Sequence, residues 1–136
     1  MIKVIYGEKG TGKTRILVES SNVMAERNYG HVVFIEDSNQ SMYKLIHKVR
    51  FINISEFPIY GEDGFIGFIC GIISQNYDTK GIFIDGLTYI LKKDVNDLEP
   101  FFSKLKVIAS KFNVEFILSV NGNAENIPGF LKEYIL

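Results

Sequence analysis

The sequence has little that points to an oxidising compartment or to a membrane. Its 136 residues include a single cysteine, Cys70, so an intramolecular disulfide is excluded. Cys70 stands in an apolar run and is expected to act as a small buried hydrophobic residue. No signal peptide is recognisable, and no apolar stretch reaches the roughly 18 residues that span a bilayer. We therefore expect a cytoplasmic protein without a membrane segment.

An excess of charge of one sign is also missing. Lys and Arg total 15, Asp and Glu total 16, and the formal net charge is −1. Non-specific nucleic-acid binders usually carry a basic face, so nucleic acid is not indicated as a partner. Internal repeats, low-complexity tracts and linkers are not visible. With 46% hydrophobic and 13% aromatic residues, the chain is expected to form one packed domain, residues 1–136.

The most informative stretch lies near the amino end and fits the pattern G-x-x-x-x-G-K-[ST]. Its glycines let successive backbone N–H groups turn inward around an anion. Lys13 would place a positive charge on the β- and γ-phosphates of a nucleotide, and the Thr14 hydroxyl would be a ligand for Mg²⁺. The predicted nucleotide-binding residues are Gly7, Glu8, Lys9, Gly10, Thr11, Gly12, Lys13, Thr14 and the following Arg15.

The flanks of this stretch match the context that the pattern requires, a loop between a strand and a helix. Residues 2–6 are a short β-branched and aromatic run that ends at Gly7. Residues 13–27 contain neither Pro nor Gly and predict a helix, whose positive dipole end would face the same anion. The alternative is a glycine-rich turn without a ligand, which the combined match disfavours.

The second predicted strand, residues 31–35, is a short continuous apolar run of the kind that is buried on both faces. Asp37 with Gln40 three residues later resembles a capping box, so a helix through His47 is expected to begin there. A capping role would explain why Asp37 is acidic, but it does not explain the acidic residue at position 36. Glu36 directly follows the strand, where open α/β sheets bind ligands.

A third strand is predicted at residues 50–54, followed by a turn-rich segment at residues 57–64. Residues 65–77 are apolar nearly all round, which predicts a helix that is buried or forms an interface. Gly67 and Gly71 would let another backbone approach closely. Core packing and a subunit contact both stay open for this helix.

Asp85 follows a glycine-led apolar strand at residues 81–84. This arrangement matches the Walker B pattern, in which a carboxylate beside the phosphate site holds the hydration shell of Mg²⁺. Because Asp commonly ends strands, the prediction of a metal site rests on the first motif and on the strand and helix spacing between the two.

The rest of the chain continues the alternation of strands and helices. Residues 87–94 predict a loop or short helix, residues 97–112 an amphipathic helix with Pro100 in its first turn, and residues 114–120 the last clear strand. Asn121 is either part of a simple turn or a polar residue between the two phosphate motifs that orients a water or senses the γ-phosphate. Residues 126–136 predict a short helix or tail with an extended end. This order predicts a three-layer α/β/α fold around a mainly parallel five-stranded sheet.

These segments together resemble the core of P-loop NTPases of the RecA type, which include recombinases, replicative helicases and KaiC-like ATPases. The resemblance rests on residues 7–14, 33–37, 82–87 and 118–121, of which the first is the most specific. It implies ATP and Mg²⁺ as cofactors and a strand order of 3-2-4-5-1. It also implies catalytic roles for Lys13 and for Glu36, the latter as the general base that orients the attacking water. No guanine-reading Asn-Lys-x-Asp element is present.

Members of this group usually carry further strands beside the first one. Here the strand at residues 2–6 would lie at the edge of the sheet, so the C-terminal tail or a second subunit is expected to cover it. Arg15, Arg27 and Arg50 are the only arginines, and none is placed as an arginine finger. A protein partner or a homo-oligomer is therefore expected.

Three functions stay open at this point. The first is an ATP-binding protein with slow or partner-stimulated, Mg²⁺-dependent hydrolysis. The second is a nucleotide-dependent switch or assembly module without useful turnover, which the missing arginine finger favours. The third is a small-molecule kinase, which ranks last because only residues 55–64 offer a long loop for a lid.

Overall fold

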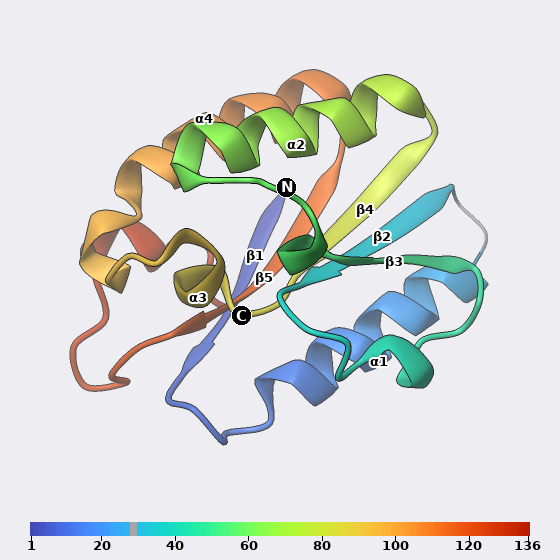
Figure 1. The fold of residues 1–136 in the computed structure, drawn as a ribbon. Helices are drawn as coiled ribbons and strands as arrows, with labels where there is room; N and C mark the ends of the chain where they lie inside the picture. The colour runs from blue at the N-terminus through green and yellow to red at the C-terminus, as the bar shows by residue number, and fades with distance from the viewer. Residues whose placement is uncertain (28–29) are drawn as a thin grey trace.

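A five-stranded parallel sheet forms the middle layer of the computed structural model, which describes residues 1–27 and 30–136 (Figure 1). All four neighbouring strand pairs run parallel, and helices cover both faces. This confirms the predicted fold class. The strands are β1 (Ile2–Gly7), β2 (His31–Glu36), β3 (Val49–Asn53), β4 (Thr79–Ile84) and β5 (Glu115–Asn121).

The strand order is β1-β5-β4-β2-β3. Read from the other edge, this is 3-2-4-5-1, the order expected from the sequence. Because the strands are parallel, their carboxyl ends meet at one edge of the sheet. The register places Gly7 beside Asn121 and Ile84 between Ile35 and Leu118. The polar residues that end β2 and β5 and follow β4 therefore share that edge.

The helices are divided unequally between the two faces of the sheet. Helix α1 (Lys13–Glu26) packs on one face, where Leu17, Val18 and Ala25 form a core with alternate strand residues such as Phe34 and Ile117. The opposite face carries α2 (Gly61–Gln75), α3 (Leu87–Leu91) and α4 (Glu99–Phe112), the last with Pro100 in its first turn as predicted. Figure 1 shows α2 and α4 side by side above the sheet and α1 below it.

The predicted helix through His47 is wrong. The segment after β2 is a turn that leads into one short 3-10 helix, Met42–Lys44. Side chains capture the amides that an α-helix would use: Ser41 N–H donates to the Glu36 carboxylate and Gln40 N–H donates to Ser38 Oγ at 3.3 Å. Such local side-chain bonds compete with helix formation.

Helix α2 begins earlier than predicted, at Gly61, so residues 61–64 are helical and not part of a loop. The loop predicted at residues 55–64, the one available for a kinase lid, is correspondingly shorter. Phe65, Ile69 and Ile73 point into the core, which confirms core packing for this face of the helix. Gly67 and Gly71 are exposed, with open space where a Cβ would lie.

The C-terminal segment pairs with the outer edge of β1. Val4 N–H donates to Tyr134 O at 2.8 Å, Leu136 N–H donates to Val4 O at 3.0 Å, and Ile135 forms a parallel bridge with Val4. The Tyr134 ring stacks on Phe102 of α4, with 5.4 Å between the ring centroids. The sequence left open whether the C-terminal tail or a second subunit covers this edge. At Val4 the structure shows the tail.

None of the helices in the described part of the chain combines the length and the hydrophobicity that crossing a membrane requires.

Candidate functional site

The loop between β1 and α1 has the backbone that the glycine pattern predicts. Gly10 and Gly12 have φ angles of 84° and 85°, a left-handed conformation that favours glycine. Gly12 is also the N-cap of α1, and no side chain caps this helix. The first amides of α1 are therefore available at the positive end of the helix dipole, an arrangement suited to an anion.

Lys13 lies inside this loop with only 8% of its surface exposed. Its Nζ donates to Glu8 O at 2.6 Å and lies 3.5 Å from Thr11 Oγ1, and Thr11 Oγ1 donates to the same carbonyl at 2.8 Å. Burial lowers the pKa of Lys13, while the negative charge of Asp85 acts in the opposite direction. The loop thus holds the ammonium group in place before any ligand arrives.

The two sequence motifs meet through Asp85. Thr14 Oγ1 donates to Asp85 Oδ2 at 2.9 Å, although the two residues are 71 positions apart. The second carboxylate oxygen, Oδ1, accepts a bond of 2.6 Å from Ser119 Oγ, and Gly86 N–H donates to Ser119 Oγ at 2.8 Å. The structure thus brings together Thr14 and Asp85, the two predicted metal ligands.

Sequence reasoning missed Ser119. The available signal was a hydroxyl in the apolar run of β5, at a position that is 1% exposed. A buried hydroxyl needs a hydrogen-bond partner, so it points to a polar group close by. That partner is Asp85, which directly follows β4, so the sequence around Ser119 does not reveal it.

Glu36 ends β2 with 2% of its surface exposed. Ser41 N–H donates to both of its carboxylate oxygens, at 3.1 and 3.3 Å. Burial raises the pKa of Glu36, the Ser41 N–H opposes this shift, and the negative charges of Asp85 and Asp37 add to it. A carboxylate with a raised pKa is a better proton acceptor near neutral pH.

These residues line one cavity of about 940 Å³ at the carboxyl edge of the sheet. Asn121 lines the same cavity, as do Lys9, Gly10, Gly12 and Arg15 from the predicted set, whereas Gly7, Glu8 and Thr11 are not among its lining residues. Arg15 is exposed and pairs with Glu19 at 3.1 Å. Tyr89, Lys44 and Gln40 also line the cavity and were not predicted.

The oxygen atoms at the floor of this cavity suit a hard cation. Mg²⁺ is commonly held by one or two protein oxygens and completes its shell with water and phosphate oxygens. The Thr14 hydroxyl and the Asp85 carboxylate are such donors, and they already lie 2.9 Å apart. The residues present therefore fit a magnesium ion that arrives with a phosphate ligand.

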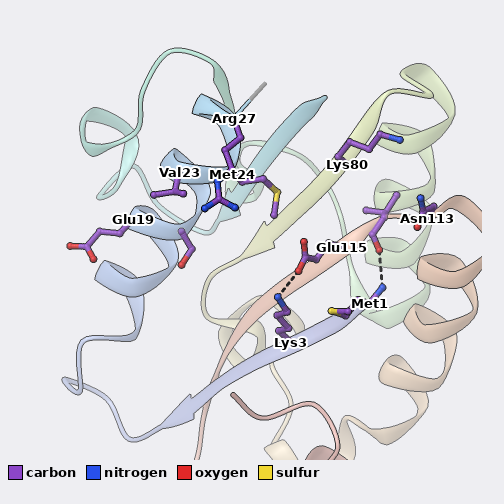
Figure 2. A pocket seen from close by; sticks show the side chains of 11 residues that line it. Met1, Lys3, Glu19, Val23, Met24, Arg27, Lys80, Asn113 and Glu115 are labelled. Atoms are coloured by element: carbon purple, nitrogen blue, oxygen red, sulfur yellow. Dashed lines mark hydrogen bonds and ion pairs between the residues drawn. The ribbon is translucent and has the colours of Figure 1, made fainter. Parts of the chain in front are cut away.

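A second hollow, of about 810 Å³, lies at the opposite ends of the strands, between α1 and the start of β1, β4 and β5 (Figure 2). Two pairs of its polar groups contact each other: Lys3 pairs with Glu115 at 2.8 Å, and the Met1 amine donates to Val114 O at 3.3 Å. Figure 2 shows Glu19 pointing away from this hollow. None of the predicted site residues lines it, so the chemistry of the molecule is concentrated at the other edge.

The fold and site define a three-layer α/β/α protein with a RecA-like sheet. No family of known proteins matches the sequence, and none of the curated proteins compared with it matches. Among solved structures, the chain is similar to a KaiC-like protein from the hyperthermophilic archaeon Pyrococcus horikoshii OT3, with a TM-score of 0.64 and 18% sequence identity. The match covers 93% of this chain but 63% of that chain. At this level of identity the likeness concerns the fold, which is a RecA-like fold of the KaiC-like kind.

Proposed function

We propose that this chain binds ATP together with Mg²⁺ and hydrolyses it slowly. The observation that carries the proposal is the 2.9 Å hydrogen bond between Thr14 and Asp85, because it joins the two motifs that P-loop proteins use for phosphate and metal. The choice of ATP follows from the resemblance to RecA-type proteins, and the KaiC-like structural neighbour supports it.

Each residue has a distinct task in this proposal. The amides that follow Gly12 and the Lys13 ammonium bind the phosphates, and Thr14 and Asp85 would hold Mg²⁺. When bound, the metal ion neutralises negative charge on the phosphate oxygens. Glu36 accepts a proton from the water that attacks the γ-phosphate, and its raised pKa suits this task. Asn121, at the end of β5, lines the same cavity and would sense the γ-phosphate.

Hydrolysis is expected to be slow in the isolated chain. Arg15 is the only arginine among the described residues that line the cavity, and its side chain is 83% exposed and paired with Glu19. P-loop enzymes that lack a positioned arginine turn over at about 10⁻³ s⁻¹, and an added arginine finger raises the rate by about 10³- to 10⁵-fold. A protein partner or a second copy of the chain is the proposed source of that missing charge.

The first test measures ATP binding by calorimetry with and without Mg²⁺. Lys13→Ala should weaken binding at least about 100-fold, because a buried charge that faces the phosphates is lost. Lys132→Ala, which removes an exposed lysine in the C-terminal segment, is the matched control and should bind like the wild type. Equal binding by the wild type and Lys13→Ala would end the proposal.

The second test concerns the general base and measures phosphate release. Glu36→Gln should lower the rate at least about 100-fold and leave ATP binding within about threefold of the wild type. Asp37→Asn removes the same charge from the next, exposed position and should lower the rate much less. A loss of rate in Asp37→Asn but not in Glu36→Gln would move the base to Asp37.

A second candidate function is a nucleotide-dependent switch or assembly module, and the exposed, already paired Arg15 favours it. In that case ATP binding would change the molecular mass in solution while turnover stays negligible. Light scattering with ATP, with ADP and without nucleotide distinguishes the two. A mass that is the same in all three states, with measurable turnover, would exclude the switch.

A further inference from the structure

We propose that Ser119 is a positioning residue of the metal site, which sets the affinity of the nucleotide-bound protein for Mg²⁺. This inference rests on the proposed function, because it concerns how Asp85 is presented to the ion. Ser119 does not contact the reacting atoms in this proposal. It acts through Asp85 and through the backbone that follows Asp85.

The geometry shows one hydroxyl on each oxygen of the Asp85 carboxylate. Ser119 Oγ on β5 donates to Oδ1 at 2.6 Å, and Thr14 Oγ1 on α1 donates to Oδ2 at 2.9 Å. The carboxylate cannot rotate without losing one of these bonds. Ser119 therefore leaves Oδ2, the oxygen beside Thr14, as the one presented to an incoming cation.

The location of Ser119 explains why it can reach this position. Side chains alternate between the faces of a sheet, so Ser119 lies on the same face as Ile117, which packs in the core under α1. Its neighbours Leu118 and Val120 point to the other face, into the core under α2 and α4. The Ser119 hydroxyl therefore lies on the face of the sheet that carries Thr14 and the first turn of α1, whereas Leu118 and Val120 do not.

The same hydroxyl also fixes the main chain after Asp85. Gly86 N–H donates to Ser119 Oγ at 2.8 Å, at the point where the chain leaves β4 with a φ angle of 75°. Ser119 therefore accepts one bond from the backbone and donates one to the side chain. Alanine at position 119 would free both the carboxylate and the turn that carries it.

The experiment titrates MgCl₂ and follows binding of a fluorescent ATP analogue. Loss of a group that orients a metal ligand typically costs about 10- to 100-fold in metal affinity. Ser119→Ala should therefore raise the Mg²⁺ concentration for half-maximal binding at least about tenfold. In EDTA, its affinity for the analogue should equal that of the wild type, because Lys13 and the loop amides are unchanged.

Two further variants separate positioning from folding. Ser119→Thr keeps the hydroxyl and should restore a Mg²⁺ requirement close to that of the wild type. Ser21→Ala is the matched control, since Ser21 is equally buried but its hydroxyl donates to Val18 O within α1, at 2.9 Å. It should leave the titration unchanged.

The outcomes distinguish the two proposals. Absence of Mg²⁺-dependent binding in the wild type would defeat the proposed function itself. If the wild type responds to Mg²⁺ and Ser119→Ala gives the same titration curve, the role of Ser119 is overturned and the proposed function stands. Equal weakening of Ser119→Ala with Mg²⁺ and in EDTA would also overturn it, because that result marks a general structural role.

Discussion

Glu36 is the residue whose environment conflicts most with its charge. It is 2% exposed, it lies near the carboxylates of Asp85 and Asp37, and the Ser41 N–H group donates to it. Burial of an ionised carboxylate costs free energy unless several donors compensate. Residues of this kind are retained at functional sites in spite of that cost.

Replacement of Glu36 by Gln should therefore stabilise the protein at neutral pH. The pKa of Glu36 is raised in the folded state, so its contribution to stability is present at low pH and is lost as the pH rises through that pKa. Glu36→Gln removes the ionised form and should increase the free energy of unfolding by about 1 kcal/mol at pH 7.5. Urea unfolding at pH 7.5 and at pH 4 measures this gain, which should shrink at the lower pH.

Asp37→Asn is the control variant. Because Asp37 is exposed, its charge stays solvated and costs little free energy of folding. A larger gain from Asp37→Asn than from Glu36→Gln at pH 7.5 would contradict this account.

At the scale of elements, periodicity and turn residues predicted the five strands, α1 and α4 to within two residues at each end. They failed between β2 and β3, where the capping pattern at Asp37 and Gln40 predicted a helix. Here the Ser41 N–H donates to the Glu36 carboxylate instead of to a helical carbonyl. A local capping pattern cannot predict this bond, because it depends on the burial of Glu36 at the end of β2. Ser119 was missed for a related reason, since its partner Asp85 follows β4 and is 34 residues away in the sequence.

The C-terminal segment gives a prediction about the edge of β1. Tyr134→Ala removes a half-buried ring that stacks on Phe102, and it should lower the free energy of unfolding by about 2 kcal/mol. The amide of Val4, which donates to Tyr134 O at 2.8 Å, should then exchange its hydrogen faster. Hydrogen exchange followed by NMR measures this effect at Val4.

The matched control is Glu133→Ala, which keeps the Tyr134 ring. Burial raises the pKa of the Tyr134 hydroxyl, and the neighbouring Glu133 adds to that shift. Glu133 is exposed and pairs with Lys106 at 3.6 Å on the surface, so its loss should cost about 0.5 kcal/mol or less. Unchanged protection of Val4 in Tyr134→Ala would show that the tail does not hold this edge.

At the scale of the whole molecule, the parallel sheet collects Lys13, Thr14, Glu36, Asp85 and Asn121 at one edge, from the start of one helix and the ends of three strands. Because the motif residues lie at strand ends or directly after them, a correct strand order was enough to predict that they meet. The side-chain hydrogen bonds were not predictable in this way, since they depend on the distances between strands.

A ligand that bridges these elements should stabilise the whole fold. ATP with Mg²⁺ at 100 times its dissociation constant adds about 2.7 kcal/mol to the free energy of unfolding, which raises the midpoint of thermal unfolding by roughly 10 °C. Asp85→Asn should lose most of the part that depends on Mg²⁺ and keep the shift seen with ATP in EDTA. Scanning calorimetry measures both, and an Asp85→Asn shift equal to that of the wild type would exclude Asp85 as a metal ligand.

The position of β1 has a consequence for how the chain is made. This strand carries the phosphate loop, yet its partners are β5 and the segment around Ile135, both more than a hundred residues later in the chain. Contacts so distant in sequence form slowly. On the ribosome, β1 must therefore wait without these neighbours while the residues up to β5 are synthesised, and during that interval its exposed apolar residues are a binding site for a chaperone.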